Sequence, residues 1–194
     1  MQDVRLAIRK DIRQQRNALS SLEQVNEAKQ LLTQLKCLPQ LEHAKNVALY
    51  LSVDGELDTT PVIEYLWQQG KQVFLPVLHP FSKGHLLFLH YAKETVMTLN
   101  TFKIPEPKLQ LSNVIPMAQL DIIFTPLVAF DARGNRLGMG GGYYDRSLAR
   151  WHKTGKGAVP IGIAHNCQQI AKVPTERWDI PLPFIVTPSK IWKW

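Results

Sequence analysis

Residues 121–146 have the sequence DIIFTPLVAFDARGNRLGMGGGYYDR, which joins three kinds of segment in one short stretch. Residues 121–125 are mostly apolar, as is typical of a buried strand in a parallel sheet. Residues 131–134 have the composition of a turn, and we expect a helix from Tyr143 to His152. A strand, a loop and a helix in this order predict an α/β fold, in which ligands bind beyond the carboxyl ends of the strands.

The loop in this stretch, residues 134–146, contains five of the eleven glycines of the chain. Glycine lets backbone N–H groups turn toward an anion, and a helix start adds positive potential at the same place. Arg136 and Arg146 flank the loop and can neutralise phosphate. Asp145 can hold the metal that accompanies a nucleoside triphosphate. The loop is therefore predicted to bind phosphate.

Two familiar phosphate-binding motifs do not match this loop. No Gly-Lys-Ser/Thr ends it, and the sixth position counted from Gly138 is Tyr143 rather than glycine. The alternative interpretation is a flexible glycine-rich connection. Adjacent tyrosines and an Asp-Arg pair have no purpose in a plain connection, so they favour a binding site.

The rest of the chain predicts further alternation of strands and helices. Residues 1–38 are expected to be helical, with a second helix that starts at Ser20 or Ser21 near Glu23 and stops before Pro39. Another helix is expected from Thr59 or Thr60 to Gly70. The remaining predicted strands are residues 47–51, 73–75 (ended by Pro76), 86–91, 127–130, 160–164 and 184–187, and residues 92–119 are expected to have little regular structure.

This pattern predicts one domain, residues 1–194, of the three-layer α/β class. We expect an open, mostly parallel, Rossmann-like sheet flanked by helices, with an N-terminal helical hairpin (residues 1–38) packed on the core.

The net charge of +7 is concentrated at the two ends of the chain. Residues 131–194 carry ten Lys/Arg against four Asp/Glu. A basic surface suits nucleic acid, but it equally suits a small polyanion such as ATP or a polyglutamate. Because the chain has no arginine-rich tail and no aromatic-basic repeat, nucleic acid is the weaker interpretation.

Several other features of the sequence bear on the cellular location of the protein. No apolar run approaches the ~20 residues that span a bilayer, and the first residues lack a secretory apolar region. Cys37 and Cys167 fit no metal-ligand spacing and are expected to be buried thiols rather than a disulfide. We expect a cytoplasmic protein.

Three more groups are candidates for chemistry. Arg5 and Arg9 are four residues apart, share a helix face and can clamp phosphate oxygens, although most such charge runs are solvated faces. Glu56 follows a strand and can accept hydrogen bonds from a polar heterocycle, although an exposed turn glutamate is the default. Asp179 with Asp145 would make a two-carboxylate magnesium site.

Other enzyme classes find no support in the sequence. The six histidines show no HExxH spacing, and no Gly-x-Ser-x-Gly is present, which disfavours zinc proteases and α/β-hydrolases. His165 follows a predicted strand and is expected to be a structural residue.

The most specific pattern is Arg136-Leu137-Gly138-x-Gly140-x-Gly142-Tyr143-Tyr144-Asp145-Arg146, preceded by Pro126-x-x-Ala129-Phe130-Asp131. It resembles the pattern of the 5-formyltetrahydrofolate cyclo-ligase family, also called 5,10-methenyltetrahydrofolate synthetases. Three further elements resemble that family: Arg5 to Arg9, the turn Leu51 to Glu56, and Pro174-x-Glu176-x-x-Asp179. The resemblance covers nearly the whole chain.

The resemblance implies an ATP- and Mg²⁺-dependent conversion of 5-formyltetrahydrofolate to 5,10-methenyltetrahydrofolate, with release of ADP and phosphate. In the implied reaction the formyl oxygen is phosphorylated, N10 of the folate attacks the activated carbon, and phosphate leaves. The protein then mostly positions the reactants and stabilises charge. The partner is a reduced folate, with or without a polyglutamate tail, and we expect a monomer.

The resemblance also implies roles for individual residues. The implied ATP-binding residues are Arg5, Leu6, Ala7, Ile8, Arg9, Arg136, Leu137, Gly138, Met139, Gly140, Gly141, Gly142, Tyr143 and Tyr144. The implied folate-binding residues are Leu51, Glu56, Met139, Gly140, Gly141, Gly142 and Tyr143. Asp145 and Asp179 would hold Mg²⁺, and the implied catalytic residues are Arg136, Tyr143 and Asp145.

The sequence departs from the family pattern in the loop. Many members carry a basic residue at one or both of the positions of Met139 and Gly141, which are uncharged here. Arg136, Arg146 or another basic residue would then stabilise the transferring phosphoryl group. The alternative functions are a non-catalytic folate- or nucleotide-binding protein and a basic nucleic-acid-binding module.

Overall fold

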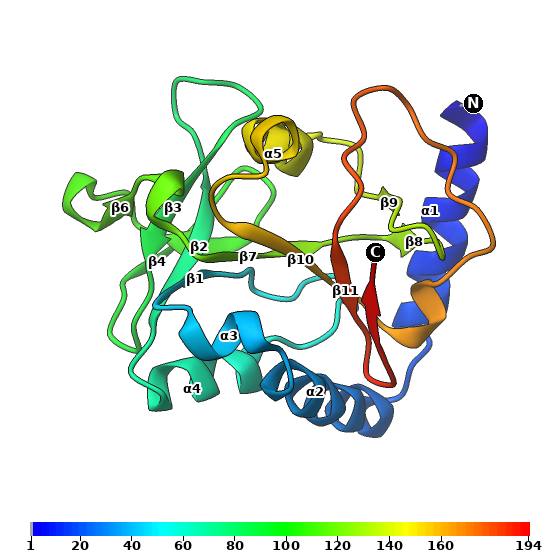
Figure 1. The fold of residues 1–194 in the computed structure, drawn as a ribbon, viewed down its shortest axis with the longest axis horizontal. Coiled ribbons are helices and arrows are strands. Elements are labelled where there is room, and N and C mark those ends of the chain that lie inside the picture. Colours follow the sequence, from blue (N-terminus) through cyan, green and yellow to red (C-terminus); the bar gives the residue numbers. More distant parts are fainter. Residues whose placement is uncertain (1) are drawn as a thin grey trace.

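The computed structural model describes residues 2–194, which form a central sheet with helices on both faces (Figure 1). The α-helices are α1 Gln2–Asn17, α2 Ser21–Lys36, α3 Pro39–His43, α4 Thr60–Gln68 and α5 Tyr143–Thr154, and the 3₁₀ turns are η1 Leu111–Asn113, η2 Met117–Gln119 and η3 Asn166–Gln168. The strands are β1 Asn46–Ala48, β2 Gln72–Leu78, β3 Leu86–His90, β4 Met97–Leu99, β5 Pro105–Pro107, β6 Val114–Ile115, β7 Ile122–Pro126, β8 Ala129–Phe130, β9 Arg136–Leu137, β10 Val159–Ile163, β11 Phe184–Val186 and β12 Ile191–Lys193.

The main sheet has the order β12-β11-β10-β7-β1-β2-β3-β6. The five central strands, β11 to β2 in this order, run parallel. At the edges, β12 is antiparallel to β11, and β3 is antiparallel to both β2 and β6. Chain order therefore reverses between β1 and β7. This is the doubly wound arrangement that was expected, and the crevice at such a reversal is the usual ligand site.

Apolar cores lie on both faces of the sheet, because successive residues of a strand point to opposite sides. In β7, Phe124 packs in the core that contains Leu31 of α2 and Leu66 of α4. Its neighbour Ile123 packs in the other core with Leu148 of α5. Figure 1 accordingly shows α2, α3 and α4 on one side of the sheet and α5 on the other. The predicted three-layer fold is confirmed.

The two N-terminal helices cover different parts of this core. A capping box between Ser20 and Glu23 starts α2 as predicted. α1 contacts β8 and η3, where Ile12 packs against Val128 and Leu137. α2 packs instead on α3, α4 and β11. Figure 1 shows the two helices at a wide angle, so they diverge rather than lie side by side.

Pro76 does not end β2, contrary to the prediction. The strand continues to Leu78, and Pro76 lies opposite Phe88 of β3. The ladder between β1 and β2 ends at Phe74, so the missing N–H of Pro76 costs no bond to a neighbouring strand there. The predicted 47–51 strand is correspondingly short, since β1 spans only Asn46–Ala48.

Three other segments contain strands that were not predicted. Within residues 92–119, β4 and β5 form a small antiparallel pair and β6 joins the main sheet, so this segment is more regular than expected. Arg136-Leu137, expected in the loop, forms β9 and pairs with β8. The C-terminal Trp192-Lys193 belongs to β12, which pairs with β11. Among the described residues, no helix is long and apolar enough to cross a membrane.

Candidate active site

The predicted site residues come from three segments that meet near the reversal of strand order. The turn after β1 carries Glu56, and the segment after β7 carries the β8–β9 ribbon and the glycine loop. α1 runs beside both segments: Arg9 bonds to the glycine loop, and Arg16 bonds to the turn after β1. Glu56 and the loop both lie beyond the carboxyl ends of strands, because they follow the neighbouring parallel strands β1 and β7.

The glycine loop has a backbone that requires glycine at several positions. Gly140 has a φ of 105° and Gly142 a φ of 66°, in the region that disfavours side chains. A Cβ at Gly141 would lie 2.6 Å from Cε2 of Tyr143. Gly142 is the N-cap of α5 and offers no side chain, so the first N–H groups of that helix are left for a ligand or solvent.

Arg136 is buried at the base of this loop, with 4% of its surface exposed. Its Nη1 donates to Oδ1 of Asp145 over 2.8 Å. Nε and Nη2 are buried and have no hydrogen-bond partner within the described chain. Burial lowers the pKa of Arg136, and Asp145 opposes that change. An anion that accepts two hydrogen bonds would satisfy this guanidinium.

Asp145 and Asp179 are brought to one place, as predicted for a magnesium site. The backbone N–H of Ile180, the residue after Asp179, donates to Oδ1 of Asp145 over 3.2 Å. Both oxygens of Asp179 accept from Arg5, over 2.7 and 3.1 Å. Burial opposes ionisation of Asp179, but Arg5 and a backbone N–H outweigh it and lower its pKa. Each carboxylate therefore forms an ion pair with an arginine: Asp145 with Arg136 and Asp179 with Arg5.

Arg9 reaches the loop directly, because its Nε donates to the carbonyl of Gly138 over 2.8 Å. It forms no ion pair with the described residues. Leu6 and Ala7, which the resemblance also assigned to ATP, lie on the exposed side of α1. The helix thus presents Arg5 and Arg9 inward, while Ile8, the third intervening residue assigned to ATP, packs against the apolar cluster around Ile12.

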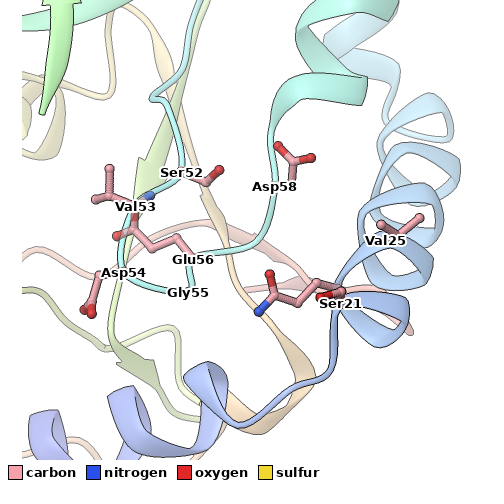
Figure 2. A pocket seen from close by; sticks show the side chains of 9 residues that line it. Ser21, Val25, Ser52, Val53, Asp54, Gly55, Glu56 and Asp58 are labelled. Atoms are coloured by element: carbon pink, nitrogen blue, oxygen red, sulfur yellow. The ribbon is translucent and has the colours of Figure 1, made fainter.

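Glu56 is not an exposed turn glutamate, since its side chain is only 10% exposed. The turn has positive φ at Asp54 (52°) and Gly55 (70°), and Oε2 of Glu56 accepts from the Val53 N–H over 3.2 Å. Figure 2 shows the carboxylate folded back toward Val53. This turn lines a cavity of about 330 Å³ together with Ser21 and Val25 of α2. Leu51, the other predicted folate residue, precedes the turn and is half-buried.

Tyr144, the second residue of α5, follows the glycines of the loop and lies near Glu56 of this turn. Burial raises the pKa of Tyr144, and the nearby Glu56 carboxylate raises it further. The pKa of Tyr50, two residues after the end of β1, is raised by the same two causes. The hydroxyl of Thr59 donates to the Tyr50 carbonyl over 2.6 Å instead of capping α4.

Arg146 has a different environment from the one expected. Its Nε donates to the carbonyl of Gly84 over 2.7 Å, and Nη2 donates to the carbonyl of Gly141. The guanidinium also lies 5.6 Å from the ring centroid of Tyr143. Arg146 therefore ties the glycine loop to the β2–β3 turn and is engaged by carbonyl groups.

Two buried groups near Glu56 were not singled out as functional from the sequence. Arg16 is fully buried on α1 and bonds to the Asp54 turn. His165 is also fully buried, Nδ1 pairs with Oε2 of Glu27, and Nε2 has no partner within the described chain. For Arg16 a signal existed: it lies eleven residues after Arg5, on the same helix face, as three turns of an α-helix span about eleven residues.

Known proteins resemble this chain along nearly its whole length. The profile of the 5-formyltetrahydrofolate cyclo-ligase family matches residues 1–188. Proteins called 5-formyltetrahydrofolate cyclo-ligase are 53% identical in Escherichia coli K12, over 94% of this chain and 100% of the relative, and 53% identical in Haemophilus influenzae, over 92% and 94%. An NMR structure of Aquifex aeolicus 5,10-methenyltetrahydrofolate synthetase is similar with a TM-score of 0.82 and 29% identity, covering 98% of this chain and 92% of that one. The chain belongs to the 5-formyltetrahydrofolate cyclo-ligase family.

Proposed function

We propose that this enzyme converts 5-formyltetrahydrofolate to 5,10-methenyltetrahydrofolate at the glycine loop, using ATP and Mg²⁺ and releasing ADP and phosphate. Family membership supports the reaction. The observation that carries the site is the guanidinium of Arg136, which is buried beside the glycine loop with two nitrogens, Nε and Nη2, that have no hydrogen-bond acceptor among residues 2–194.

The reaction has two steps, and the protein has a different role in each. The formyl oxygen attacks the γ-phosphorus of ATP and ADP leaves; N10 then attacks the formyl carbon and phosphate leaves, while N10 loses its proton. Arg136, Arg9 and the first N–H groups of α5 would bind phosphate oxygens and stabilise their charge. Glu56 would accept hydrogen bonds from the folate ring and hold N10 on the side of the formyl carbon.

The residues present fit a magnesium ion that arrives with ATP. Asp145 and Asp179 supply two carboxylates, and Mg²⁺ is ordinarily held by one or two carboxylates plus phosphate oxygens and water. No group of three or more His, Cys, Asp or Glu side chains suited to a metal occurs among residues 2–194. When bound, the ion would neutralise phosphate charge, while Arg5 and Arg136 hold the two carboxylates in place.

The remaining expectations extend this proposal. The substrate is a reduced folate, with or without a polyglutamate tail, and the protein acts as a monomer in the cytoplasm. The basic excess of residues 131–194 suits both ATP and a polyglutamate tail.

One absorbance experiment tests the proposed function. The methenyl product has its own chromophore, which should appear only when the enzyme, ATP, Mg²⁺ and 5-formyltetrahydrofolate are all present, with one ADP per product. Folate binding without ADP release would replace the proposal with a non-catalytic binding protein. Tight, steeply salt-dependent binding to RNA or DNA would point to a nucleic-acid module.

A further inference from the structure

Arg16 is a fully buried cation on the last turn of α1. Its Nε donates to the backbone carbonyl of Asp54 over 2.8 Å, and Nη2 donates to Oδ2 of the same residue over 2.8 Å. These bonds fix the turn at a residue with a left-handed φ of 52°, which a non-glycine residue adopts only when its surroundings hold it there. Arg16 is therefore built into the turn that carries Glu56.

The third nitrogen of Arg16 points to the next carboxylate. Nη1 is buried, has no hydrogen bond within the described chain, and lies 4.0 Å from Oε1 of Glu56. Burial raises the pKa of Glu56, and Arg16 is the strongest of the groups that oppose this change. A buried carboxylate 4 Å from a buried cation gains far more from it than an exposed pair does, because water does not screen the two charges.

Other charged and titratable groups face this pair from every neighbouring element. Asp54 is on the same turn and raises the pKa of Glu56, whereas His165, after β10, lowers it. Tyr50, in the segment after β1, and Tyr144 of α5 lie near Glu56. Glu27 of α2 pairs with His165. Cys167 of η3 is close enough to Arg16 for the guanidinium to lower the pKa of its thiol. Arg13, one turn earlier on α1, pairs with Asp54.

We propose that Arg16 is a positioning residue, which keeps the Glu56 carboxylate ionised and in place so that it can accept hydrogen bonds from the folate ring. The inference rests on the proposed role of Glu56 in folate binding. Arg16 itself touches neither substrate; it acts through Glu56 and through the Asp54 turn. Its removal should therefore change the binding of folate and leave the binding of ATP unchanged.

The test is the dissociation constant of 5-formyltetrahydrofolate, measured by calorimetry between pH 5 and 9 without ATP. In Arg16→Gln the midpoint below which binding weakens should move upward by about one to three pH units. Affinity should fall about tenfold or more below that midpoint and recover toward the wild-type value above it. Arg16→Lys keeps the charge and should return the midpoint toward that of the wild type.

Arg13→Gln is the matched control, because Arg13 binds the same Asp54 carboxylate over 2.6 Å but is half-exposed. It should leave the midpoint where it is. Asp54→Asn removes the negative neighbour of Glu56 and should move the midpoint downward. This variant tests the direction of the charge effect on Glu56 even if Arg16→Gln does not fold. An unchanged midpoint in Arg16→Gln, or the same upward shift in Arg13→Gln, would overturn the inference.

Glu56→Gln separates this inference from the proposed site. If it abolishes the pH dependence and weakens folate binding, Glu56 has its proposed role and the Arg16 variants decide the inference. If folate binds Glu56→Gln as tightly as the wild type at every pH, the folate site itself is wrongly placed, and the inference fails together with it.

Discussion

Replacing Arg136 by lysine isolates what its planar fork contributes to the use of ATP. A lysine ammonium can still pair with Asp145, so this partly buried carboxylate keeps a cation. It cannot reproduce the fixed geometry of Nε and Nη2, for which the described part of the chain offers no acceptor. If both nitrogens bind phosphate oxygens, two charge-assisted hydrogen bonds of about 1.5–3 kcal/mol each are lost.

The sum of about 3–6 kcal/mol corresponds to a fall of roughly 10² to 10⁴ in kcat/KM for ATP. The assay is methenyl formation at varied ATP concentration, with unfolding monitored by circular dichroism. Arg136→Ala should be worse still and should also destabilise the fold by about 3–5 kcal/mol, because it leaves Asp145 without its cation.

Arg133→Lys is the matched control, since Arg133 is exposed on the turn before β9. It should retain wild-type kinetics. A folded Arg136→Lys enzyme whose kcat/KM for ATP stays within about threefold of the wild type would refute the assignment of those two nitrogens to phosphate.

Further predictions concern the metal and the turn after β1. Asp145→Asn should lose Mg²⁺-dependent activity while the protein stays folded; an unaltered dependence of rate on Mg²⁺ concentration would remove Asp145 from the metal site. Gly55→Ala should lower the free energy of unfolding by about 1–3 kcal/mol in a denaturant titration, because the φ of 70° disfavours a side chain and the new Cβ would lie 2.5 Å from Oδ1 of Asn17. Gly70→Ala has the same φ sign at 69° and open space, so it should cost less; equal losses in the two variants would show that the contact with Asn17 is unimportant.

The sheet and its helices follow largely from local patterns, and the differences arise where tertiary context decides. Apolar runs mark the central strands, and the Ser20–Glu23 pair marks the start of α2. Pro76 is tolerated inside β2 only because β1 is too short to flank it, and no local pattern shows how far a neighbouring strand extends. The C-terminal β12 likewise depends on an available edge of the sheet.

The candidate site divides in the same way. The glycines, Arg136 and Glu56 stand in recognisable local patterns, whereas two of the ion pairs around the site join distant parts of the chain. Arg5 pairs with Asp179, 174 positions away, and His165 with Glu27, 138 positions away. A carboxylate that pairs with an arginine looks the same in sequence as one that binds a metal, so only the fold reveals that Asp145 and Asp179 each have a cationic partner.

The C-terminal strand contacts the turn before β9, so the order in which the chain is synthesised affects when that turn gains its tertiary contacts. Trp194 donates through Nε1 to the carbonyl of Ala132 over 2.7 Å and packs over Gly134, at the turn that leads into β9 and Arg136. In a nascent chain these two contacts can form only after residues 191–194 have left the ribosome. An intermediate that lacks them should already contain the central strands but bind nucleotide poorly, and a stop codon before Ile191 should impair ATP use more than it impairs folding.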